Sequence, residues 1–162
     1  MIRALCLAED REAIWHLMRD SADYIWMERE EPPLPYLVDE FFSDAPPGLS
    51  AADGYRAGLF EGERLLALAD LSFGFPNPGD SYLGLMIVPA AARGTGAGKR
   101  LLRHLEEVAR SKGAAAMYLA VLDVNPRGRA FWQREGFAPT GAHGTVTLGQ
   151  KTQTVQRLGK PL

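Results

Sequence analysis

The 162 residues suffice for one domain with its own hydrophobic core, and we expect residues 1–162 to form a single domain. Apolar residues make up 46% and charged residues 23%, which is typical of a globular protein and argues against a disordered or fibrous one. The formal net charge is -2 and Lys and Arg are scattered, so we expect no nucleic-acid partner.

Metal-ligand and membrane patterns are also missing. The chain has one cysteine, Cys6, and three histidines, His16, His104 and His143, which are far apart in the sequence. No spacing typical of a metal site joins them, so we expect no metal. No apolar run approaches the roughly 18 residues of a membrane span, and no basic segment followed by an apolar run opens the chain. We expect a cytoplasmic protein without a membrane partner.

The first part of the chain predicts a short strand and two helices. Residues 2–7 have a strand pattern, and Asp10 is placed to cap a helix with an apolar stripe over residues 13–18. The polar and aromatic stretch 24–35 breaks the helical pattern. Residues 34–42 predict a second short helix.

Strands dominate the middle of the chain. Residues 55–60 and 64–73 flank a Glu-Gly-Glu turn that suits a hairpin, and a turn rich in Pro and Gly leads into a strand over residues 82–88. These three strands predict an antiparallel meander. A Gly-rich loop follows, and then a helix with one apolar face over residues 101–109, ended by Gly113 as a left-handed cap.

The last part predicts one strand, one helix and two more strands. Residues 115–122 form the strand candidate, Asn125 suits an N-cap, and Pro126 suits the first helical position. Gly136 ends that helix, and residues 137–158 contain two further strand-like runs. The predicted order is β-α-α-β-β-β-α-β-α-β-β, an α/β fold with a mixed sheet flanked by helices.

The Gly-rich loop is a candidate phosphate-binding site. It joins a strand to a helix, where backbone N–H groups lack partners and the helix dipole is positive, so main chain alone can bind a diphosphate. Glycines allow the phosphates to approach closely. The loop and helix start comprise Arg93, Gly94, Thr95, Gly96, Ala97, Gly98 and Lys99.

Two better-known nucleotide motifs do not fit this loop. The P-loop pattern needs Gly where the chain has Arg93, and Ser or Thr where it has Arg100. The dinucleotide fingerprint needs Gly where the chain has Lys99 or Leu101. Neither a nucleoside triphosphate nor NAD is favoured.

The loop resembles the acetyl-CoA signature of the GNAT superfamily, in which Arg or Gln is followed after two residues by Gly and then by Gly or Ala. Arg93, Gly96 and Gly98 occupy those positions. A second segment, 125–137, resembles the family's later motif through its Asn, Ala, aromatic pair and Gly-Phe. Together with the strand order, the resemblance covers roughly residues 55–158.

This resemblance implies a splayed sheet in which the strands ending near Val88 and Leu122 part to admit the pantetheine arm of acetyl-CoA. The cofactor contacts that it implies, besides the loop, are the main chain of Met86, Ile87 and Val88, and the side chains of Asn125, Phe131 and Trp132. It further implies that an amine attacks the thioester directly, with a main-chain N–H near Ile87 stabilising the oxyanion and Asn125 at the acceptor side.

The general base is not fixed by the sequence. Asp70, late in one strand, and Asp80, just before the next, are the best placed carboxylates, although an aspartate in such a position is more often a solvated turn or strand-end residue. The proton donor also departs from the family pattern, because Trp132 stands where many members have Tyr and an indole does not release its proton near neutral pH. A CoA-binding sensor or interaction module without turnover is therefore an alternative to the enzyme.

An acceptor site is expected around the segment 24–31, where aromatic residues lie beside acidic ones. Tyr24, Trp26 and Glu28 suit a cationic amine through ring faces and a carboxylate, although a solvated acidic turn would have the same composition. We expect a small-molecule or peptide amine as acceptor. A homodimer is an open alternative for the assembly.

Overall fold

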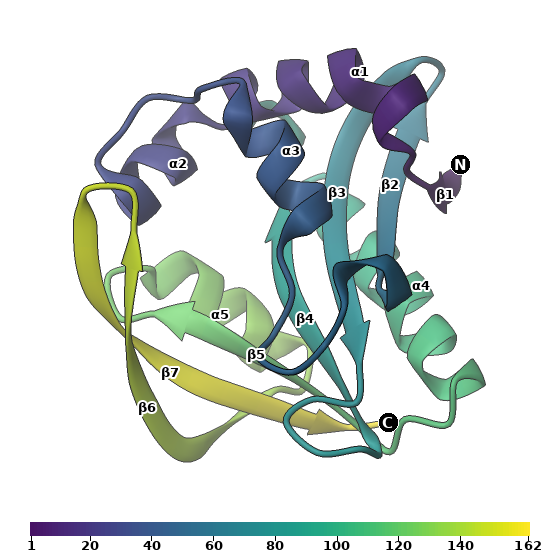
Figure 1. Ribbon diagram of the computed structural model, residues 1–162, viewed down its shortest axis with the longest axis vertical. Helices are drawn as coiled ribbons and strands as arrows, with labels where there is room; N and C mark the ends of the chain where they lie inside the picture. The colour runs from purple at the N-terminus through teal and green to yellow at the C-terminus, as the bar shows by residue number, and fades with distance from the viewer.

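The computed structural model describes residues 1–162. Seven strands form one sheet in the order β1-β2-β3-β4-β5-β7-β6, in which only β4 and β5 run parallel (Figure 1). The strands are β1 (Ile2–Ala4), β2 (Tyr55–Glu61), β3 (Arg64–Phe73), β4 (Asp80–Ile87), β5 (Ala116–Leu122), β6 (Ala138–Leu148) and β7 (Lys151–Pro161).

Five α-helices cover the two faces of this sheet. They are α1 (Leu7–Asp20), α2 (Ala22–Arg29), α3 (Tyr36–Ser43), α4 (Ala97–Ser111) and α5 (Pro126–Arg134), with short 3-10 turns η1 (Ala51–Asp53) and η2 (Ala90–Ala92). The N-terminal helices α1, α2 and α3 pack on one face, and α4 packs on the other (Figure 1). No helix is long and apolar enough to cross a membrane.

The central strand β3 shows why two cores form. Its buried side chains alternate between the faces: Leu65 and Leu68 pack under the N-terminal helices, whereas Ala67, Ala69 and Leu71 pack under α4. A strand covered on both faces has a nearly continuous apolar run instead of the alternation of a half-exposed strand. The run over residues 65–71 is of that kind.

The predicted α/β class and mixed sheet are confirmed, but the element order contains one more helix than expected. The stretch 24–35 was expected to interrupt the helical pattern, yet α2 continues to Arg29 and ends at Glu30, whose φ is 53°. Only Ile25 and Arg29 are buried in α2, so it has no apolar stripe wide enough to be seen in the sequence.

The start of α1 also differs from the expectation. The helix begins at Leu7, and Asp10 lies inside its first turn rather than at the cap position. The Asp10 carboxylate accepts a hydrogen bond of 2.7 Å from the Cys6 N–H and pairs with Arg3 at 2.7 Å. Asp10 therefore satisfies the free N–H at the helix start from within the helix instead of from before it.

Local signals for the other helix ends are confirmed. Gly113 follows α4 with φ of 83°, and Gly136 follows α5 with φ of 97°. The Asn125 side chain caps α5 by accepting a 2.9 Å hydrogen bond from the Gly128 N–H. Each of these ends depends on one or two residues, which explains why the sequence predicts them.

The sheet is splayed between its two parallel strands. β4 and β5 pair only at Asp80 with Ala116, Ser81 with Met117, and Tyr82 with Tyr118. Beyond that point β4 stays paired with β3 and β5 stays paired with β7, but no pairs join β4 to β5. The carboxyl-terminal halves of β4 and β5 are thus two facing edges without a strand between them.

Candidate active site

A large cleft opens where β4 and β5 part. Its volume is about 470 Å³, and its walls come from the end of β4, the Gly-rich loop, the start of α4, one side of α5 and part of α2. The lining residues are Asp23, Tyr24, Met27, Met86, Ile87, Val88, Ala92, Arg93, Gly94, Gly96, Gly98, Lys99, Asn125, Arg127, Gly128, Phe131, Trp132, Arg134 and Glu135. We refer to this cavity as the large cleft.

The Gly-rich loop leaves its cleft side open. Gly94 and Gly96 have φ values of 75° and 88°, and a Cβ atom added to either would meet no atom within 4 Å. Left-handed backbone favours glycine, and the open space lets a ligand approach the main chain closely. The N-terminus of α4, with Gly96 as N-cap and no side chain bound to it, faces this space.

Two loop residues of the expected site do not line the large cleft. The Thr95 hydroxyl donates a 2.5 Å hydrogen bond to the Ala92 carbonyl, which holds the loop in shape, and Ala97 is buried beneath it. Gly98 does line the cleft, and a Cβ added there would lie 3.4 Å from Val88 and 3.5 Å from Phe131. Thr95 and Ala97 are thus part of the scaffold of the loop.

Positive side chains surround the large cleft. Arg93 and Lys99 were expected there, whereas Arg127 and Arg134 on α5 were not. Nothing in the spacing of these two arginines distinguishes them from solvated charges on a helix, which is why sequence reasoning missed them. Together the four cations suit an anionic ligand.

Arg93 also connects the loop to α2. Its guanidinium pairs with Asp23 at 2.6 Å, and its Nε donates a 2.9 Å hydrogen bond to the Val88 carbonyl. The hydrogen bond from Arg93 holds the pKa of the Asp23 carboxyl below its usual range. Arg93 therefore joins three walls of the large cleft.

The aromatic side chains of α5 form one wall. Trp132 packs edge-on against Phe131 and Phe137, with ring centroids 4.9 Å and 5.5 Å apart. Phe131 and Trp132 line the cleft, as does Asn125, whose side-chain oxygen is engaged in capping α5. These contacts fix the indole in place as an apolar surface.

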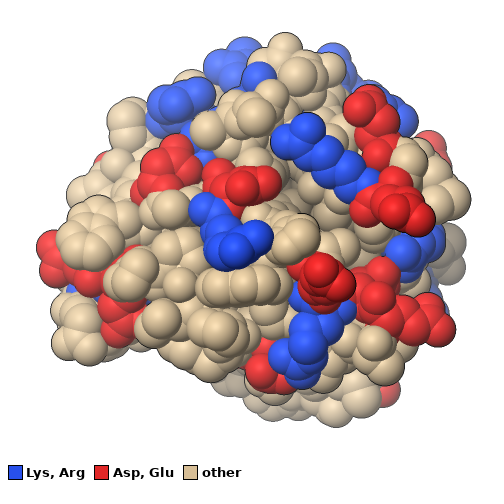
Figure 2. All heavy atoms as spheres, turned by 90° about the horizontal axis from the view of Figure 1, so that it is seen from above, with Lys and Arg blue, Asp and Glu red and all other residues tan.

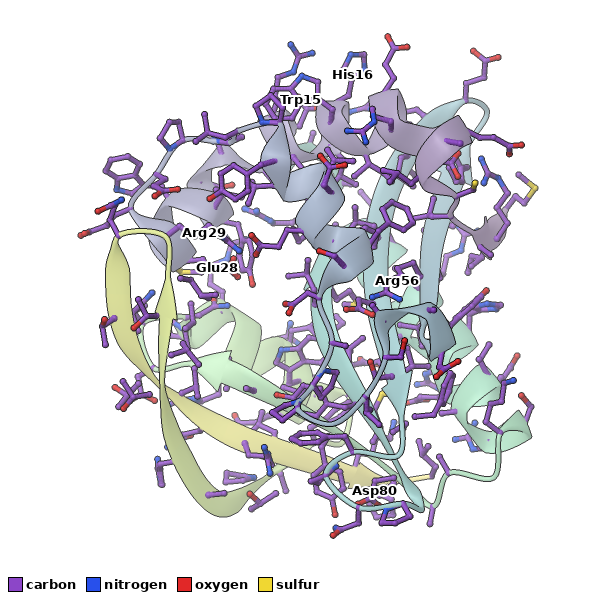
Figure 3. The ribbon with its side chains drawn as sticks, viewed as in Figure 1. Trp15, His16, Glu28, Arg29, Arg56 and Asp80 are labelled. Carbon is purple, nitrogen blue, oxygen red and sulfur yellow. The ribbon has the colours of Figure 1, made fainter.

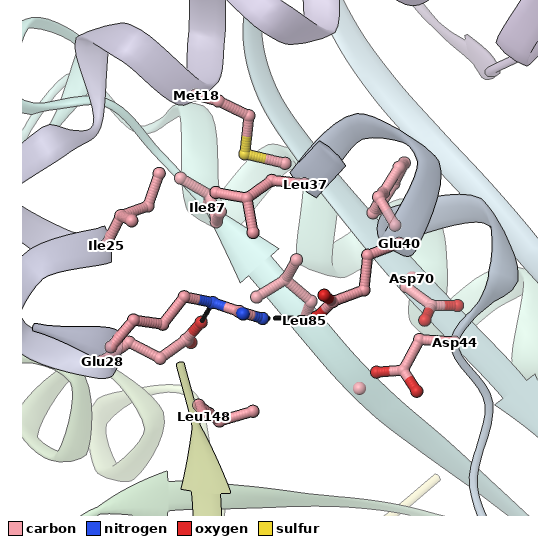
Figure 4. A pocket seen from close by; sticks show the side chains of 13 residues that line it. Met18, Ile25, Glu28, Leu37, Glu40, Asp44, Asp70, Leu85, Ile87 and Leu148 are labelled. Carbon is pink, nitrogen blue, oxygen red and sulfur yellow. Dashed lines mark hydrogen bonds and ion pairs between the residues drawn. The ribbon is translucent and has the colours of Figure 1, made fainter. Parts of the chain in front are cut away.

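A second, smaller cavity of about 110 Å³ lies beneath the N-terminal helices (Figure 4). We call it the acidic recess, because four carboxylates line it. Its lining residues are Met18, Ile25, Glu28, Arg29, Leu37, Glu40, Phe41, Asp44, Asp70, Gly84, Leu85, Ile87 and Leu148. Ile87, at the end of β4, lines both cavities.

Asp70 is the most unusual group in the recess. The residue is 6% exposed, its carboxylate accepts no hydrogen bond, and its nearest opposite charge is the Arg56 Nε, 3.5 Å from Oδ1. The Arg56 guanidinium is already bound to the main-chain oxygens of Phe41, Ala51 and Asp44. Loss of hydration raises the pKa of Asp70 to about 6, with Arg56 opposing and Asp44 adding to the shift.

A register shift places Asp70 beside the recess. Asp70 pairs with Leu85 and Leu71 pairs with Leu83, so Gly84 has no partner in β3. A Cβ added to Gly84 would lie 3.4 Å from the Asp70 Oδ2. The bulge and the glycine together leave space for this carboxylate on the recess side of the sheet.

Asp80, the other candidate base, lies elsewhere. It begins β4, at the opposite end from Ile87, and accepts a 3.0 Å hydrogen bond from the Asn77 side chain. Figure 3 shows Asp80 far below the group formed by Glu28, Arg29 and Arg56. It lines neither the large cleft nor the acidic recess.

The three expected acceptor residues are divided among different places. Glu28 lines the acidic recess and Tyr24 lines the large cleft, whereas Trp26 is 56% exposed and lines neither. Burial raises the pKa of both Glu28 and Tyr24. Different sides of α2 thus face the two cavities, and Trp26 lies on the outer side of the helix.

Arg29 and Glu40 are recess residues that the sequence did not indicate. The Arg29 guanidinium is mostly buried and binds Glu28 at 3.2 Å and Glu40 on α3 (Figure 4). The partners are separated by 11 positions and a loop, so no local pattern predicts the pair. Leu148 comes from still farther along the chain.

The outer surface has no large region of one charge on the face seen in Figure 2. Lys and Arg side chains alternate there with Asp and Glu. Trp15 and His16 project outward from α1 on this side of the molecule (Figure 3).

The Gly-rich loop at a helix N-terminus, the splayed parallel strands and the cleft between them all fall within residues 11–137, which match the acetyltransferase (GNAT) family model. The chain belongs to this family. The match covers the Gly-rich loop, the splay and α5. It ends just before β6.

Curated relatives share shorter stretches with this GNAT chain. An acetyltransferase of Agrobacterium fabrum is 33% identical over 76 residues, which are 47% of this chain and 54% of that protein. A probable glucosamine 6-phosphate N-acetyltransferase of Oryza sativa is 41% identical over 56 residues, or 35% of this chain and 32% of that protein. The chain therefore matches about half or less of these relatives' length.

Solved GNAT structures match the whole chain in fold. An acetyltransferase from Thermus thermophilus has a TM-score of 0.76 at 22% identity, and the match covers 100% of this chain and 96% of the Thermus chain. The PaiA N-acetyltransferase from Thermoplasma acidophilum, solved in complex with coenzyme A, has a TM-score of 0.71 at 18% identity. This match covers 100% of the present chain and 98% of the PaiA chain. At these identities the likeness concerns the fold.

Proposed function

We propose that this GNAT protein is an N-acetyltransferase that moves an acetyl group from acetyl-CoA directly to an amine. The observation that carries the proposal is the meeting of two different cavities at Ile87. The large cleft has an open glycine loop and four cations against two carboxylates, Asp23 and Glu135, whereas the acidic recess has an excess of carboxylates. An anionic acyl donor and a cationic acceptor suit these two sides respectively.

The residues of the large cleft fit acetyl-CoA. Main-chain N–H groups at Gly94, Gly96 and the first turn of α4 would bind the diphosphate, and the nearby cations would neutralise phosphate charge. The unpaired edge of β4 at Met86, Ile87 and Val88 would pair with the amide-containing arm, as a strand would. When bound, acetyl-CoA supplies the activated acyl group as a thioester.

The N–H groups at the end of β4 suit the stabilisation of negative charge. A main-chain donor near Ile87 lies where the two cavities meet, so it can face the acyl oxygen while an amine approaches from the recess. A donor fixed in the sheet needs no reorganisation as charge develops. We assign this role to the main chain at Ile87.

Asp70 is the base that we propose. An alkylamine with a pKa near ~10.4 is almost entirely protonated at neutral pH, so a proton acceptor is needed. With a pKa of about 6, the Asp70 carboxylate is mostly ionised at pH 7 but accepts a proton more readily than an ordinary Asp. Asp80 lacks this environment.

The test combines donor binding with amine-dependent turnover. We expect acetyl-CoA to raise the melting temperature of the purified protein, and we expect release of free CoA thiol to require an amine in the same sample. Stabilisation without thiol release by any amine would favour the sensor alternative. No stabilisation by acetyl-CoA or by CoA would contradict the assignment of the large cleft.

A further inference from the structure

The acidic recess has more negative than positive charge. Glu28, Glu40, Asp44 and Asp70 supply carboxylates, and only the Arg29 and Arg56 guanidinium groups lie beside them. The four carboxylates and two guanidinium groups leave a formal excess of two negative charges. A ligand that completes this charge balance is a dication.

Neither guanidinium is free to bind an anion. Arg29 is engaged by the carboxylates of Glu28 and Glu40, and Arg56 donates to three main-chain oxygens. An incoming carboxylate or phosphate would therefore face the remaining negative charge without a donor of its own. Such a group loses its hydration without compensation.

Asp70, in contrast, has unused capacity to accept hydrogen bonds. Its side chain is 9% exposed, Oδ1 has no hydrogen-bond partner, and the residue lines the recess. Buried carboxylates normally accept several hydrogen bonds, so an orphan of this kind requires an explanation. An ammonium group has three N–H donors and no acceptor, and it would satisfy this carboxylate.

The size and walls of the recess limit the rest of the ligand. A cavity of about 150 Å³ can hold benzene, so the roughly 110 Å³ here holds about four or five non-hydrogen atoms, which suffice for one ammonium group and most of a short methylene chain. The reacting end of the ligand would extend past Ile87 into the large cleft. Leu37, Leu85 and Leu148 contribute apolar walls between the charged groups. This combination suits a short methylene chain.

We propose that the acidic recess selects a short aliphatic diamine as the acetyl acceptor and rejects amines that also carry a carboxylate. The inference rests on the proposed function, and it assigns a substrate class to the acceptor side. One ammonium group binds among the Glu28, Glu40 and Asp44 carboxylates. The other ammonium group gives its proton to Asp70, and the free amine attacks the thioester beside Ile87 and displaces CoA as the thiol. Amino acids and sugar phosphates are excluded by their negative groups, and peptides by the small volume of the recess.

The experiment compares amines that differ only by a carboxylate. Thiol release from acetyl-CoA is measured with cadaverine against lysine and with putrescine against ornithine. We expect kcat/KM to be at least tenfold higher for the diamine in each pair. Calorimetric titration of the CoA-loaded protein, in which no acetyl group can be transferred, should show the same preference for cadaverine over lysine.

A variant of Glu40 tests whether the recess carboxylates set the preference for diamines. Glu40→Gln removes one negative charge and one partner of Arg29, so we expect the ratio of kcat/KM for cadaverine over lysine to fall at least fivefold. The control is Asp39→Asn on the same helix, because Asp39 is exposed, pairs with Arg11 and lines neither cavity. Circular dichroism and melting curves establish that both variants are folded, and Asp44→Asn, at an exposed loop position, replaces Glu40→Gln if the latter is not.

The outcomes separate this inference from the proposed function. Amine-dependent thiol release with lysine equal to or better than cadaverine would overturn the diamine assignment and leave the acetyltransferase intact. An unchanged ratio in folded Glu40→Gln or Asp44→Asn would also overturn it, since the carboxylates would then not set the preference. If acetyl-CoA neither binds nor releases thiol with any amine, the proposed function itself fails.

Discussion

Asp70 shows at the level of one residue how the surroundings of the proposed base differ from those of a structural carboxylate. Its neighbour in the recess, Glu40, is bound by Arg29, whereas Asp70 accepts no hydrogen bond. A structural carboxylate stabilises a fold by accepting hydrogen bonds, whereas a buried carboxylate that accepts none lowers stability even when a cation such as Arg56 lies 3.5 Å away. Because burial of Asp70 in this state costs stability, we infer that it has a role outside folding.

We expect Asp70→Asn to lower kcat by roughly 10²–10⁴-fold, the usual contribution of a general base. The matched control is Asp80→Asn, which also changes an aspartate on a sheet strand but lies outside both cavities. Steady-state kinetics with saturating amine should show less than a twofold change for the control. Equal losses in the two variants would remove Asp70 from the mechanism.

The same substitution should stabilise the protein in a pH-dependent way. The pKa of Asp70 is raised in the folded state from 3.8 to about 6, so between these values the folded protein holds a proton that the unfolded chain has released. The free energy of unfolding contributed by Asp70 therefore falls as pH rises through this window. At about 1.36 kcal/mol per pKa unit the loss reaches up to about 3 kcal/mol.

Urea denaturation at pH 4 and pH 7 would measure this effect. Asp70→Asn should match or exceed the wild type in unfolding free energy at pH 7, and the advantage should shrink toward pH 4. Arg56 and Asp44, the charged groups that face Asp70, remain in both proteins, so the difference reports the carboxyl group itself. The difference in unfolding free energy, Asp70→Asn minus wild type, should be larger at pH 7 than at pH 4. A smaller difference at pH 7 would contradict a raised pKa.

At the level of elements, helix α4 offers two equivalent glycines with different surroundings. Gly96 before the helix and Gly113 after it have φ values of 88° and 83°, and neither has an atom within 4 Å of an added Cβ. A side chain at either position is strained by a similar amount. Only Gly96 lines the large cleft.

We therefore expect Gly96→Trp to abolish stabilisation by acetyl-CoA and Gly113→Trp to preserve it. Both variants should lose comparable intrinsic stability, on the order of 1–2 kcal/mol, because both place a bulky residue in left-handed backbone. A thermal-shift series with increasing acetyl-CoA would measure the dissociation constant in each variant. Retained binding in Gly96→Trp would show that the donor does not use this loop.

Elements defined by a few adjacent residues could be predicted from the sequence, whereas elements defined by their tertiary surroundings could not. The Gly-rich loop, the Asn125 cap and the glycines after α4 and α5 are set by a few adjacent residues, so local patterns were enough. Helix α2 was missed because its side chains face two cavities and the solvent rather than one core. Periodicity detects burial on one side, and α2 has no such side.

The acidic recess could not be assembled from the sequence for a related reason. Glu28, Glu40, Asp70 and Leu148 come from four separate elements, and only the sheet register and the helix packing bring them together. Asp70 had to be left as one of two candidates, because its distinguishing property is burial without a hydrogen bond. That property belongs to the tertiary structure.

At the level of the whole molecule, the C-terminal hairpin is tied to the N-terminal helices. The Gln153 side chain on β7 donates hydrogen bonds of 3.0 Å each to the Met27 and Glu28 carbonyls at the end of α2. The Gln150 N–H binds the Arg29 carbonyl at 3.0 Å, and Figure 1 shows the tip of the β6–β7 hairpin against α2. The hairpin thereby holds the helix that separates the two cavities.

We expect Gln153→Ala to lower the free energy of unfolding by about 1–2 kcal/mol, because two hydrogen bonds to the end of α2 are lost. The amine KM should rise severalfold, since Glu28 and Arg29 lie in the last turn of this helix. The control is Thr154→Ala, at the next and exposed position of β7. An unchanged amine KM in a measurably destabilised Gln153→Ala would mean that the hairpin supports the fold without shaping the recess.

The separation of β4 and β5 also affects self-association of the protein through its strand edges. Free strand edges invite pairing with other chains, and this sheet has four of them, two outside and two within the cleft. The outer edges are poor templates, because β1 has three residues and β6 contains Pro139 and a register shift before His143. The two regular edges that a ligand can use face each other inside the molecule. We therefore expect the strand edges that would bind the proposed cofactor to be less accessible to neighbouring chains than an edge on the outside of the sheet would be.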